Sequence, residues 1–260
     1  MGFTTEASLR EEGGRLGDSG DGDALGVEIS NFAIIGLVDH RNDSDASSGV
    51  GGVSMPPHSL VRGLWIQHTK CGMWMNGPAR DVRFVGNIVR DTMADGINLH
   101  VGWSNTTIEG NSFRNTGDDS IALWSQAAAS AGASTDSGAT GADISTVLVE
   151  DDANADVNVT IRGNLVELTV LANGIAVYGG RDNVVVDNTI SDCIDGGGVH
   201  VGNRFDAVPL SGTTLIEGNR VARCGSPAPR GAGAAGHAES ASIWFKGLDH
   251  EGAMTGGAVD

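Results

Sequence analysis

The 260-residue sequence is poor in cysteine, in basic residues and in aromatic residues. Its three cysteines are too few for the disulfide framework that holds small secreted folds together. Sixteen Lys and Arg residues stand against 33 Asp and Glu residues, and the net charge of −17 opposes binding to nucleic acids and to anionic membranes. The same charge disfavours an anionic polysaccharide as a substrate and suits a neutral one. No apolar run is long enough to cross a membrane.

Glycine, in contrast, is abundant, with 40 residues, and the chain carries a repeat of about 24 residues. Each repeat has a four-residue stretch that ends in Asn, with an apolar residue three positions before that Asn and another two positions after it. Such short runs with alternating polarity predict β-strands, and Gly together with Asn supplies the positive φ angles of sharp corners. The asparagines in register are Asn87, Asn111, Asn164, Asn188 and Asn219.

Five corners in register predict an all-β fold, a parallel β-helix of about seven coils whose Asn side chains hydrogen-bond along their own column. We expect residues 25–260 to form this β-helix and residues 1–24 to form a polar N-terminal segment. Residues 127–156 and 225–239 are rich in small and polar residues, which predicts loops inserted between coils. Neither end offers a recognisable cap, so we expect a fragment of a longer protein.

The three cysteines fit this coiled arrangement. Cys193 and Cys224 fall in one column on neighbouring coils, where they can stack or form a bridge. We favour two buried small side chains over a bridge, and we expect Cys71 to lie in the core as well. The acidic stretches 18–23 and 150–156 could hold structural calcium, although a plain acidic loop is the favoured explanation.

Three aspartates are the most distinctive feature. Asp95 lies one repeat before Asp119, and Asp118 directly precedes Asp119. Strict alternation would bury these carboxylates inside an apolar tube, so a corner at Gly96 and Ser120 must instead place them outside, at the start of the strand. Stacked carboxylates about 4.8 Å apart repel each other, and at least one pKa should rise. Three converging carboxylates are what acid–base cleavage of a glycosidic bond requires, whereas an Asp-rich turn or a calcium site is the alternative.

The strand after each acid should send alternate side chains outward in two columns. Aromatic rings on this face can stack on sugar rings, although a Trp could equally pack at the rim and a His could be a plain surface residue. We also expect Trp103 near this face. The candidate substrate-binding residues are Trp74, Trp124, Tyr178, Asn98, His100 and His200.

Five segments carry a family resemblance: Gly63–Lys70, Gly72–Trp74, Gly77-Pro78, and the acid motifs Ala94–Asn98 and Asn115–Ser125. Together, over about residues 25–245, they resemble the catalytic domain of glycoside hydrolase family 87, which contains α-1,3-glucanases (mutanases) and mycodextranases. The resemblance implies a right-handed parallel β-helix that hydrolyses α-1,3-glucosidic linkages with inversion and without a metal in the chemistry.

The resemblance also implies that Asp95, Asp118 and Asp119 are the essential acids, and their roles have two possible assignments. By analogy with polygalacturonase-like β-helices, Asp95 and Asp119 would polarise the attacking water and Asp118 would protonate the leaving oxygen. In the swapped assignment, Asp95 is the acid and the Asp118–Asp119 pair is the base.

Two other functions compete with hydrolysis. A pectate-lyase-like polysaccharide lyase needs a Lys or Arg base, yet Lys70 and Lys246 do not adjoin the acids in the sequence and only Arg90 and Arg114 lie near them. A non-catalytic carbohydrate-binding or adhesin β-helix would bind a glucan without cutting it. For the hydrolase we expect no cofactor, an α-glucan as the partner and a monomeric state. The family implies an extracellular location, although no signal peptide follows Met1.

Overall fold

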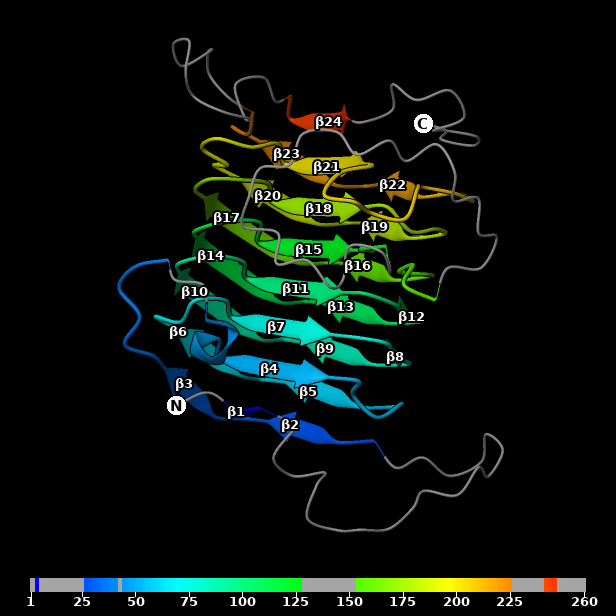
Figure 1. Cartoon of the computed structure of the whole chain (residues 1–260). Coiled ribbons are helices and arrows are strands. Elements are labelled where there is room, and N and C mark those ends of the chain that lie inside the picture. Colours follow the sequence, from blue (N-terminus) through cyan, green and yellow to red (C-terminus); the bar gives the residue numbers. More distant parts are fainter. Residues whose placement is uncertain (1–2, 5–25, 42–43, 128–152, 226–240, 247–260) are drawn as a thin grey trace, which may run out of the picture.

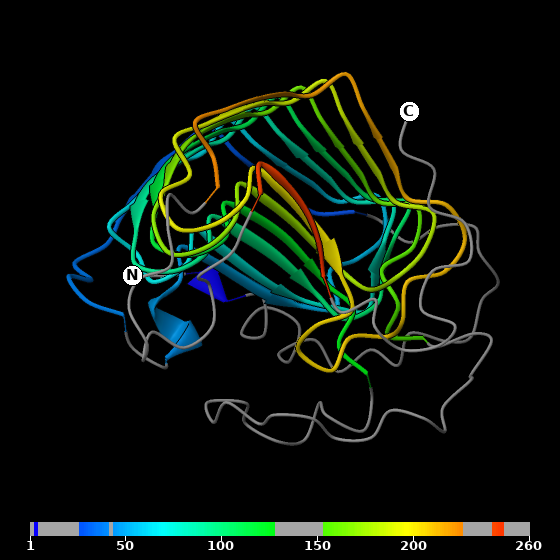
Figure 2. The same cartoon turned by 90° about the horizontal axis from the view of Figure 1, so that it is seen from above.

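The structure, a computed structural model, describes residues 3–4, 26–41, 44–127, 153–225 and 241–246. Figure 1 shows its strands stacked in layers along one axis, and Figure 2, which looks along that axis, shows the strands forming walls around the interior. All paired strands of the three large sheets run parallel, and each strand pairs with its counterpart on the next coil. The predicted right-handed parallel β-helix is therefore confirmed.

The strands fall into three large sheets, which we call A, B and C. Sheet A consists of β1 (Phe3–Thr4), β4 (Val50–Val53), β7 (Met73–Asn76), β11 (Ile97–His100), β15 (Ile121–Trp124), β18 (Ile175–Tyr178), β21 (Val199–Gly202) and β24 (Ile243–Lys246). Sheet B consists of β2 (Glu28–Ser30), β5 (Leu60–Arg62), β9 (Arg83–Val85), β13 (Thr107–Glu109), β16 (Thr160–Arg162), β19 (Val184–Val186) and β22 (Leu215–Glu217). Sheet C consists of β3 (Ala33–Ile35), β6 (Trp65–Gln67), β10 (Ile88–Thr92), β14 (Ser112–Thr116), β17 (Leu165–Thr169), β20 (Thr189–Ser191) and β23 (Arg220–Ala222).

Three short elements complete the described part of the chain. The short strands β8 (Ala79–Arg80) and β12 (Trp103–Ser104) pair with each other between sheets A and B. A single turn of 3-10 helix, η2 (Asp45–Ser47), precedes β4. Among the described residues, no helix has the length and apolar character needed to span a membrane.

The predicted asparagine ladder runs inside the corner between sheets B and C. The backbone N–H and the Nδ2 of Asn87 both donate to Oδ1 of Asn111, each at 2.9 Å, and Asn111 donates to Asn164 in the same way at 2.9 and 3.0 Å. The pattern continues through Asn188 to Asn219. Each ladder amide therefore satisfies the backbone and side chain of its neighbour, which lets a polar group sit in the core.

The residue before each ladder Asn turns the corner in the left-handed region of backbone space. Its φ is 62° at Gly86, Gly110 has the same value, and Asp187 takes 56° in the same place. Glycine adopts this conformation without steric cost, and Asp is among the side chains that tolerate it best. The glycine-rich composition therefore serves the corners, as the repeat predicts.

The apolar residues that flank each ladder Asn fill the interior. Phe84 and Ile108 of sheet B and Val89 and Phe113 of sheet C are at most 1% exposed. Trp103 also belongs to this core, because it is fully buried, packs against Phe84 and donates its Nε1–H to the carbonyl of Met75 at 3.2 Å. The expectation that Trp103 lies near the outer face of sheet A is therefore wrong, since β12 turns its side chain inward.

The cysteines follow the column that the repeat predicts. Cys71 and Cys193 are buried, Cys224 is half-buried, and all three are free thiols. The Sγ atoms of Cys193 and Cys224 lie 2.7 Å apart on neighbouring coils. Of the N-terminal segment 1–24, only Phe3–Thr4 is described, as β1 of sheet A. The rest of that segment, with its acidic stretch 18–23, and most of the loops 127–156 and 225–239 lie outside the described residues.

Candidate active site

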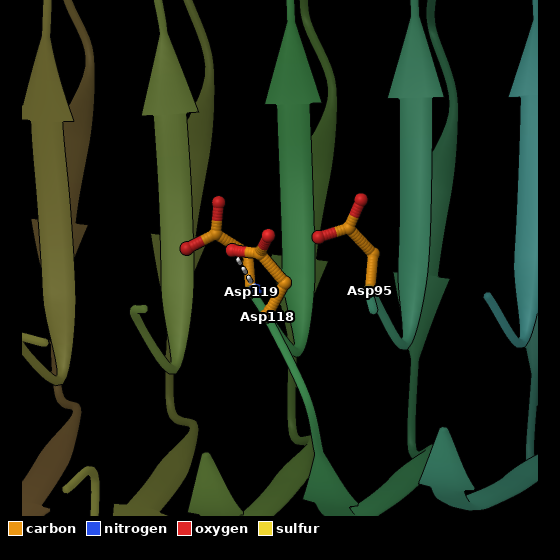
Figure 3. Close-up of side chains that lie close together, drawn as sticks. All are labelled: Asp95, Asp118 and Asp119. Carbon is orange, nitrogen blue, oxygen red and sulfur yellow. Dashed lines mark hydrogen bonds between the residues drawn. The ribbon is translucent and has the colours of Figure 1, made fainter. Parts of the chain in front are cut away.

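The three predicted aspartates converge on the outer side of sheet A, at the start of neighbouring strands. Asp95 stands two residues before β11, and Asp118 and Asp119 stand three and two residues before β15. One carboxylate oxygen from each residue lies within 4.8 Å of the others, and Figure 3 shows the three side chains reaching toward one another across two coils. The winding of the chain thus brings together acids that are separated in the sequence.

The corner between acid and strand depends on a close approach of two coils. The N–H of Gly96 donates to the carbonyl of Asp119 at 2.9 Å. A Cβ at position 96 would lie 2.3 Å from the carbonyl oxygen of Ser120 and 2.6 Å from the ring of Phe113, so glycine is required there. This corner replaces strict alternation and keeps Asp95 out of the apolar interior, as the sequence predicts.

Asp119 is the most firmly held of the three acids. Its Oδ1 accepts hydrogen bonds from the backbone N–H and the Nδ2 of Asn173, at 2.8 and 2.9 Å, and its Oδ2 accepts one from the hydroxyl of Tyr178 at 2.9 Å. Asp119 is only 5% exposed. Burial, reinforced by the neighbouring charge of Asp118, raises the pKa of Asp119 to about 7, against the opposing effect of these donors.

Asp95 is also buried but has fewer partners. Its Oδ2 accepts one hydrogen bond, from Nδ2 of Asn98 at 3.1 Å. Burial, followed by the charges of Asp118 and Asp119, raises the pKa of Asp95 well above its ordinary value. Two of the three acids therefore favour the protonated form more than an exposed aspartate does. A raised pKa is what the sequence leads us to expect, but burial contributes more to it than the repulsion between carboxylates.

Asp118 is the most exposed of the three acids and forms an ion pair with Arg41. Its Oδ1 accepts the backbone N–H of Asp119 at 3.1 Å, and its Oδ2 accepts a hydrogen bond from Arg41. Arg41 belongs to the segment before η2 and is about half exposed. It also interacts electrostatically with Asp95, so one guanidinium serves at least two of the acids.

Sequence reasoning missed Arg41 and Asn173, for different reasons. Arg41 lies in a connecting segment outside the repeat, where no spacing rule connects it to the acids. Asn173 stands two residues before Ile175, in the place that Asp119 occupies relative to Ile121, and Ile121 pairs with Ile175. The repeat therefore contained the signal for Asn173, because it continues the acid column by one coil.

The predicted outward columns of sheet A are present. Asn98 pairs with Trp74 on one side and Ala122 on the other, and His100 pairs with Trp124. His100 stacks on Trp124 with ring centroids 4.4 Å apart, and Trp74 lies 5.6 Å from His100. The three rings form a compact cluster, because Trp74 also lies 6.5 Å from Trp124, and both Trp side chains are partly exposed.

The remaining candidates are more deeply placed than the sequence indicates. His100 is in contact with Oδ1 of Asn76 at 2.7 Å and with Oε1 of Gln126 at 2.9 Å, so it is held between two amides. His200 is fully buried between the rings of Tyr178 and Trp244. Neither is a plain surface histidine. Tyr178 is 5% exposed and contacts Asp119, while contact of any of these residues with a sugar stays a prediction.

The same three aspartates could hold a divalent cation, because hard cations prefer several carboxylate oxygens at short range. In the described structure, the positive charge beside these oxygens is the Arg41 guanidinium. Acid–base chemistry and cation binding therefore compete for one set of oxygens.

Comparison with known proteins connects this geometry to a family. The model of the α-1,3-glucanase catalytic domain D2 matches residues 15–251. No match was found among curated protein sequences.

Solved structures give the same picture. The catalytic unit of a thermostable GH87 α-1,3-glucanase from Streptomyces thermodiastaticus strain HF3-3 is 32% identical, with a TM-score of 0.63 over 84% of this chain and 35% of that chain. The Agl-KA catalytic domain is 21% identical, with a TM-score of 0.56 over 77% and 35% of the two chains. A GH87 α-1,3-glucanase variant in complex with tetrasaccharides is 24% identical, with a TM-score of 0.59 over 85% and 36%. The present chain thus spans about a third of the length of these relatives.

Proposed function

Because this chain belongs to the α-1,3-glucanase catalytic domains of glycoside hydrolase family 87, we propose that it hydrolyses α-1,3-glucosidic linkages of a neutral glucan with Asp95, Asp118 and Asp119 as the reacting groups. The observation that carries this proposal is the convergence of three carboxylates within 4.8 Å, two of them with a raised pKa. Glycoside hydrolysis usually uses a pair of carboxyl groups with different pKa values, one of which is protonated while the other is ionised.

The surroundings of each acid favour the swapped assignment of roles. The acid must carry a proton at the working pH. The pKa of Asp95 is raised well above its ordinary value, and among the described residues Asn98 alone donates a hydrogen bond to its carboxylate. Asp119 accepts three hydrogen bonds, which stabilise its ionised form. We therefore assign Asp95 as the proton donor to the leaving oxygen, and Asp118, the most exposed acid, as the base that activates water beside Asp119.

Inversion rests on the family resemblance and needs its own test. Inverting glycosidases usually separate acid and base by roughly 6.5–9.5 Å, whereas retaining enzymes place them about 5–5.5 Å apart. The nearest oxygens of this cluster lie within 4.8 Å, which is closer than the inverting range. Inversion here requires that water and the glycosidic oxygen approach one compact cluster from opposite sides of the sugar ring.

The relatives lend support to the choice of residues. A GH87 α-1,3-glucanase has been solved with three different Asp-to-Ala substitutions, in complex with nigerose or tetrasaccharides. The positions of its substituted aspartates differ by 23 residues and then by one, and Asp95, Asp118 and Asp119 have the same spacing. An insoluble polysaccharide cannot enter a cell, so the proposal also includes an extracellular site of action.

The direct test is incubation of the chain with insoluble α-1,3-glucan. We expect release of reducing sugar, with the product anomer read by proton NMR before mutarotation, and loss of that release in Asp118→Asn and Asp119→Asn. Glu167→Gln is the matched control, because this acid pairs with Arg114 on sheet C and should leave cleavage unchanged. Release of sugar by both Asn variants at the wild-type rate would refute the assignment, and a first-formed anomer of retained configuration would refute inversion.

Arg41 gives one specific reason to keep the lyase alternative. A pectate-lyase-like enzyme needs a basic residue beside its acids, and Arg41 contacts Asp118, whereas Arg114 lies on sheet C and Lys70 lies over the ring of Trp74. A lyase would produce an unsaturated sugar that absorbs in the ultraviolet. A non-catalytic binding domain would pull down glucan without releasing any sugar, and the Asp variants would bind as well as the wild type.

A further inference from the structure

Tyr178, the single tyrosine of the chain, lies at the end of a strand but makes its hydrogen bonds near the start of that strand. It is the last residue of β18, yet its hydroxyl donates to Asp119 on the neighbouring coil and accepts a hydrogen bond from Nδ2 of Asn173 at 3.2 Å. Asn173 and Asp119 both stand before the start of their strands. The phenol ring must therefore lie back along the outer face of sheet A, from the end of β18 toward its beginning.

Small side chains make this path available. Ala122 and Ala176 pair with each other in the outward column of sheet A and form a buried cluster with Tyr178 and Ala207. On other coils the same column holds Trp74, Asn98 and His200. Such larger side chains at positions 122 or 176 would occupy the space that the phenol ring crosses.

Aromatic neighbours hold the ring from two sides. Phe205 meets Tyr178 edge-on, with centroids 5.1 Å apart and planes at 88°, and His200 does so at 5.4 Å and 82°. The segment that carries Phe205 follows β21 and is fixed to the coil of β15, two coils earlier, because the N–H of Val208 donates to the carbonyl of Ser125 at 2.7 Å. Indole Nε1 of Trp124 donates to the carbonyl of Phe205 at 3.0 Å.

We propose that Tyr178 is a positioning residue whose hydroxyl fixes Asp119 in one orientation and favours the ionised form of that carboxylate. The phenol ring reaches Asp119 across the small side chains of Ala122 and Ala176. The effect of Tyr178 on catalysis rests on the proposed function. Asn173 holds the other carboxylate oxygen, so neither oxygen can rotate away. The hydroxyl opposes burial and the charge of Asp118, which raise the pKa of Asp119. The other charged or titratable groups around this contact are Asp95, Arg41 beside Asp118, and Arg204 and His200 beside Tyr178.

The single tyrosine allows a test that needs no activity. With tyrosine labelled with ¹³C at Cζ, the chain gives one signal, and we expect that signal to shift with pH with a midpoint near 7, the value to which the pKa of Asp119 is raised. The step should vanish in Asp119→Asn and move to lower pH in Asp118→Asn, which removes a repelling charge. A signal that does not titrate between pH 5 and 8 would overturn the contact. A step that survives in Asp119→Asn would assign it to His200 and overturn it as well.

Kinetics then measure what the contact does. Tyr178→Phe keeps the ring and removes the donor, so we expect kcat on α-1,3-glucan to fall about 10- to 100-fold with KM little changed, and the acidic limb of the pH profile to move to higher pH. Ala122→Val should cause the same pH shift with the hydroxyl still present. An unchanged pH profile in both variants would refute the positioning role.

Trp103→Phe is the matched control for these variants. It removes one buried donor from a ring in the core, because Nε1 of Trp103 donates to the carbonyl of Met75 and to none of the three acids. It should lower stability without moving the pH profile, whereas a pH shift equal to that of Tyr178→Phe would mean that general loosening explains both. If the chain releases no sugar at all, the proposed function fails while the NMR titration still decides the contact.

Discussion

The asparagine ladder and the aspartate cluster are two buried polar arrays produced by the same winding. In the ladder, Asn111 donates to Asn164 through its backbone and its side chain, and Asn164 repeats this toward Asn188. In the cluster, Asp95 and Asp119 stand at equivalent places on neighbouring coils, yet burial, followed by the charge of Asp118, raises the pKa of both. The ladder amides satisfy one another's hydrogen bonds, whereas the carboxylates of the cluster repel one another.

The difference comes from one change of chemistry. An amide carries both a donor and an acceptor, so identical amides one coil apart complete each other. An ionised carboxylate only accepts, so identical carboxylates repel and depend on side chains that can donate. These donors are Asn173, which continues the column on the next coil, and Tyr178, Asn98 and Arg41, which lie outside the column. A stack of amides therefore serves stability, whereas a stack of acids costs stability and provides reactivity.

Converting one acid into an amide should produce the largest effect. In Asp119→Asn we expect glucan cleavage to fall by about 10²–10⁴-fold, the range typical of a lost acid–base group. Because the pKa of Asp119 is raised in the folded state, its ionisation destabilises the fold as pH rises from about 4 to about 7. The variant should accordingly be at least as stable as the wild type at pH 8.

Urea unfolding at pH 8 and sugar release, measured on the same preparation, check both halves of this expectation. Glu167→Gln supplies the control, as a conversion of acid to amide on another sheet. A variant that lost activity together with several kcal/mol of stability would show that Asp119 holds the fold together, contrary to the comparison.

Breaking the ladder should have the next largest effect, on stability alone. In Asn164→Ala the backbone N–H of Asn111 and the carbonyl of Ile108 lose their partner inside the core. Each buried polar group left without a partner costs about 1–3 kcal/mol, so we expect the free energy of unfolding to fall by roughly 2–5 kcal/mol in urea titration.

Asn219→Ala is the matched control for the ladder, because it removes the same contact from the half-buried last member, where water can replace it. Its loss should be clearly smaller. Equal losses at the two positions would mean that stacking of the coils, rather than satisfaction of buried groups, sets the contribution of each amide.

Both arrays could be predicted from the sequence because both follow the repeat. The register of Asn87 with Asn111, and of Asp95 with Asp119, is readable from spacing alone, and the structure has the same pairing. Asn173 was within reach of the same reasoning, since it continues the acid column. A period of 24 residues on a solenoid converts sequence distance directly into spatial neighbourhood.

What lies outside the repeat could not be predicted. Arg41 reaches Asp118 from a connecting segment, and Phe205 closes over Tyr178 from another, at positions that no periodicity fixes. Trp103 shows the reverse error, because proximity to the acid motif suggested the outer face while the corner at β12 sends the ring into the core. Side-chain direction at corners depends on local backbone geometry, which apolar alternation does not encode.

A third buried polar group, Asp156, offers a smaller test of the comparison. It is fully buried, its Oδ1 accepts the backbone N–H of Trp103 at 2.9 Å, and burial raises its pKa to about 7. The folded chain therefore keeps this proton between about pH 4 and pH 7, where the unfolded chain has lost it, and stability contributed by the proton disappears as pH rises through 7. Asp156→Asn should reduce the difference in unfolding free energy between pH 5 and pH 8 by about 1–3 kcal/mol.

Urea midpoints of wild type and Asp156→Asn at the two pH values measure this reduction. Part of the pH dependence should persist in the variant, because Asp95 and Asp119 titrate in the same direction. An identical pH dependence in both proteins would show that Asp156 does not retain its proton, and that buried carboxyls cost stability only when they stand in a cluster.

The smallest effect should come from charges that the same winding stacks on the solvent side of sheet B. Glu109 pairs with Arg162 at 2.9 Å and lies 3.6 Å from Arg83, with all three side chains partly exposed. Water screens such pairs, so Glu109→Gln should change the free energy of unfolding by no more than about 1 kcal/mol, and 1 M salt should remove the change. Urea titrations at low and high salt test this expectation. A loss comparable to that of Asn164→Ala would mean that register, rather than exclusion of water, decides what a stacked polar group contributes.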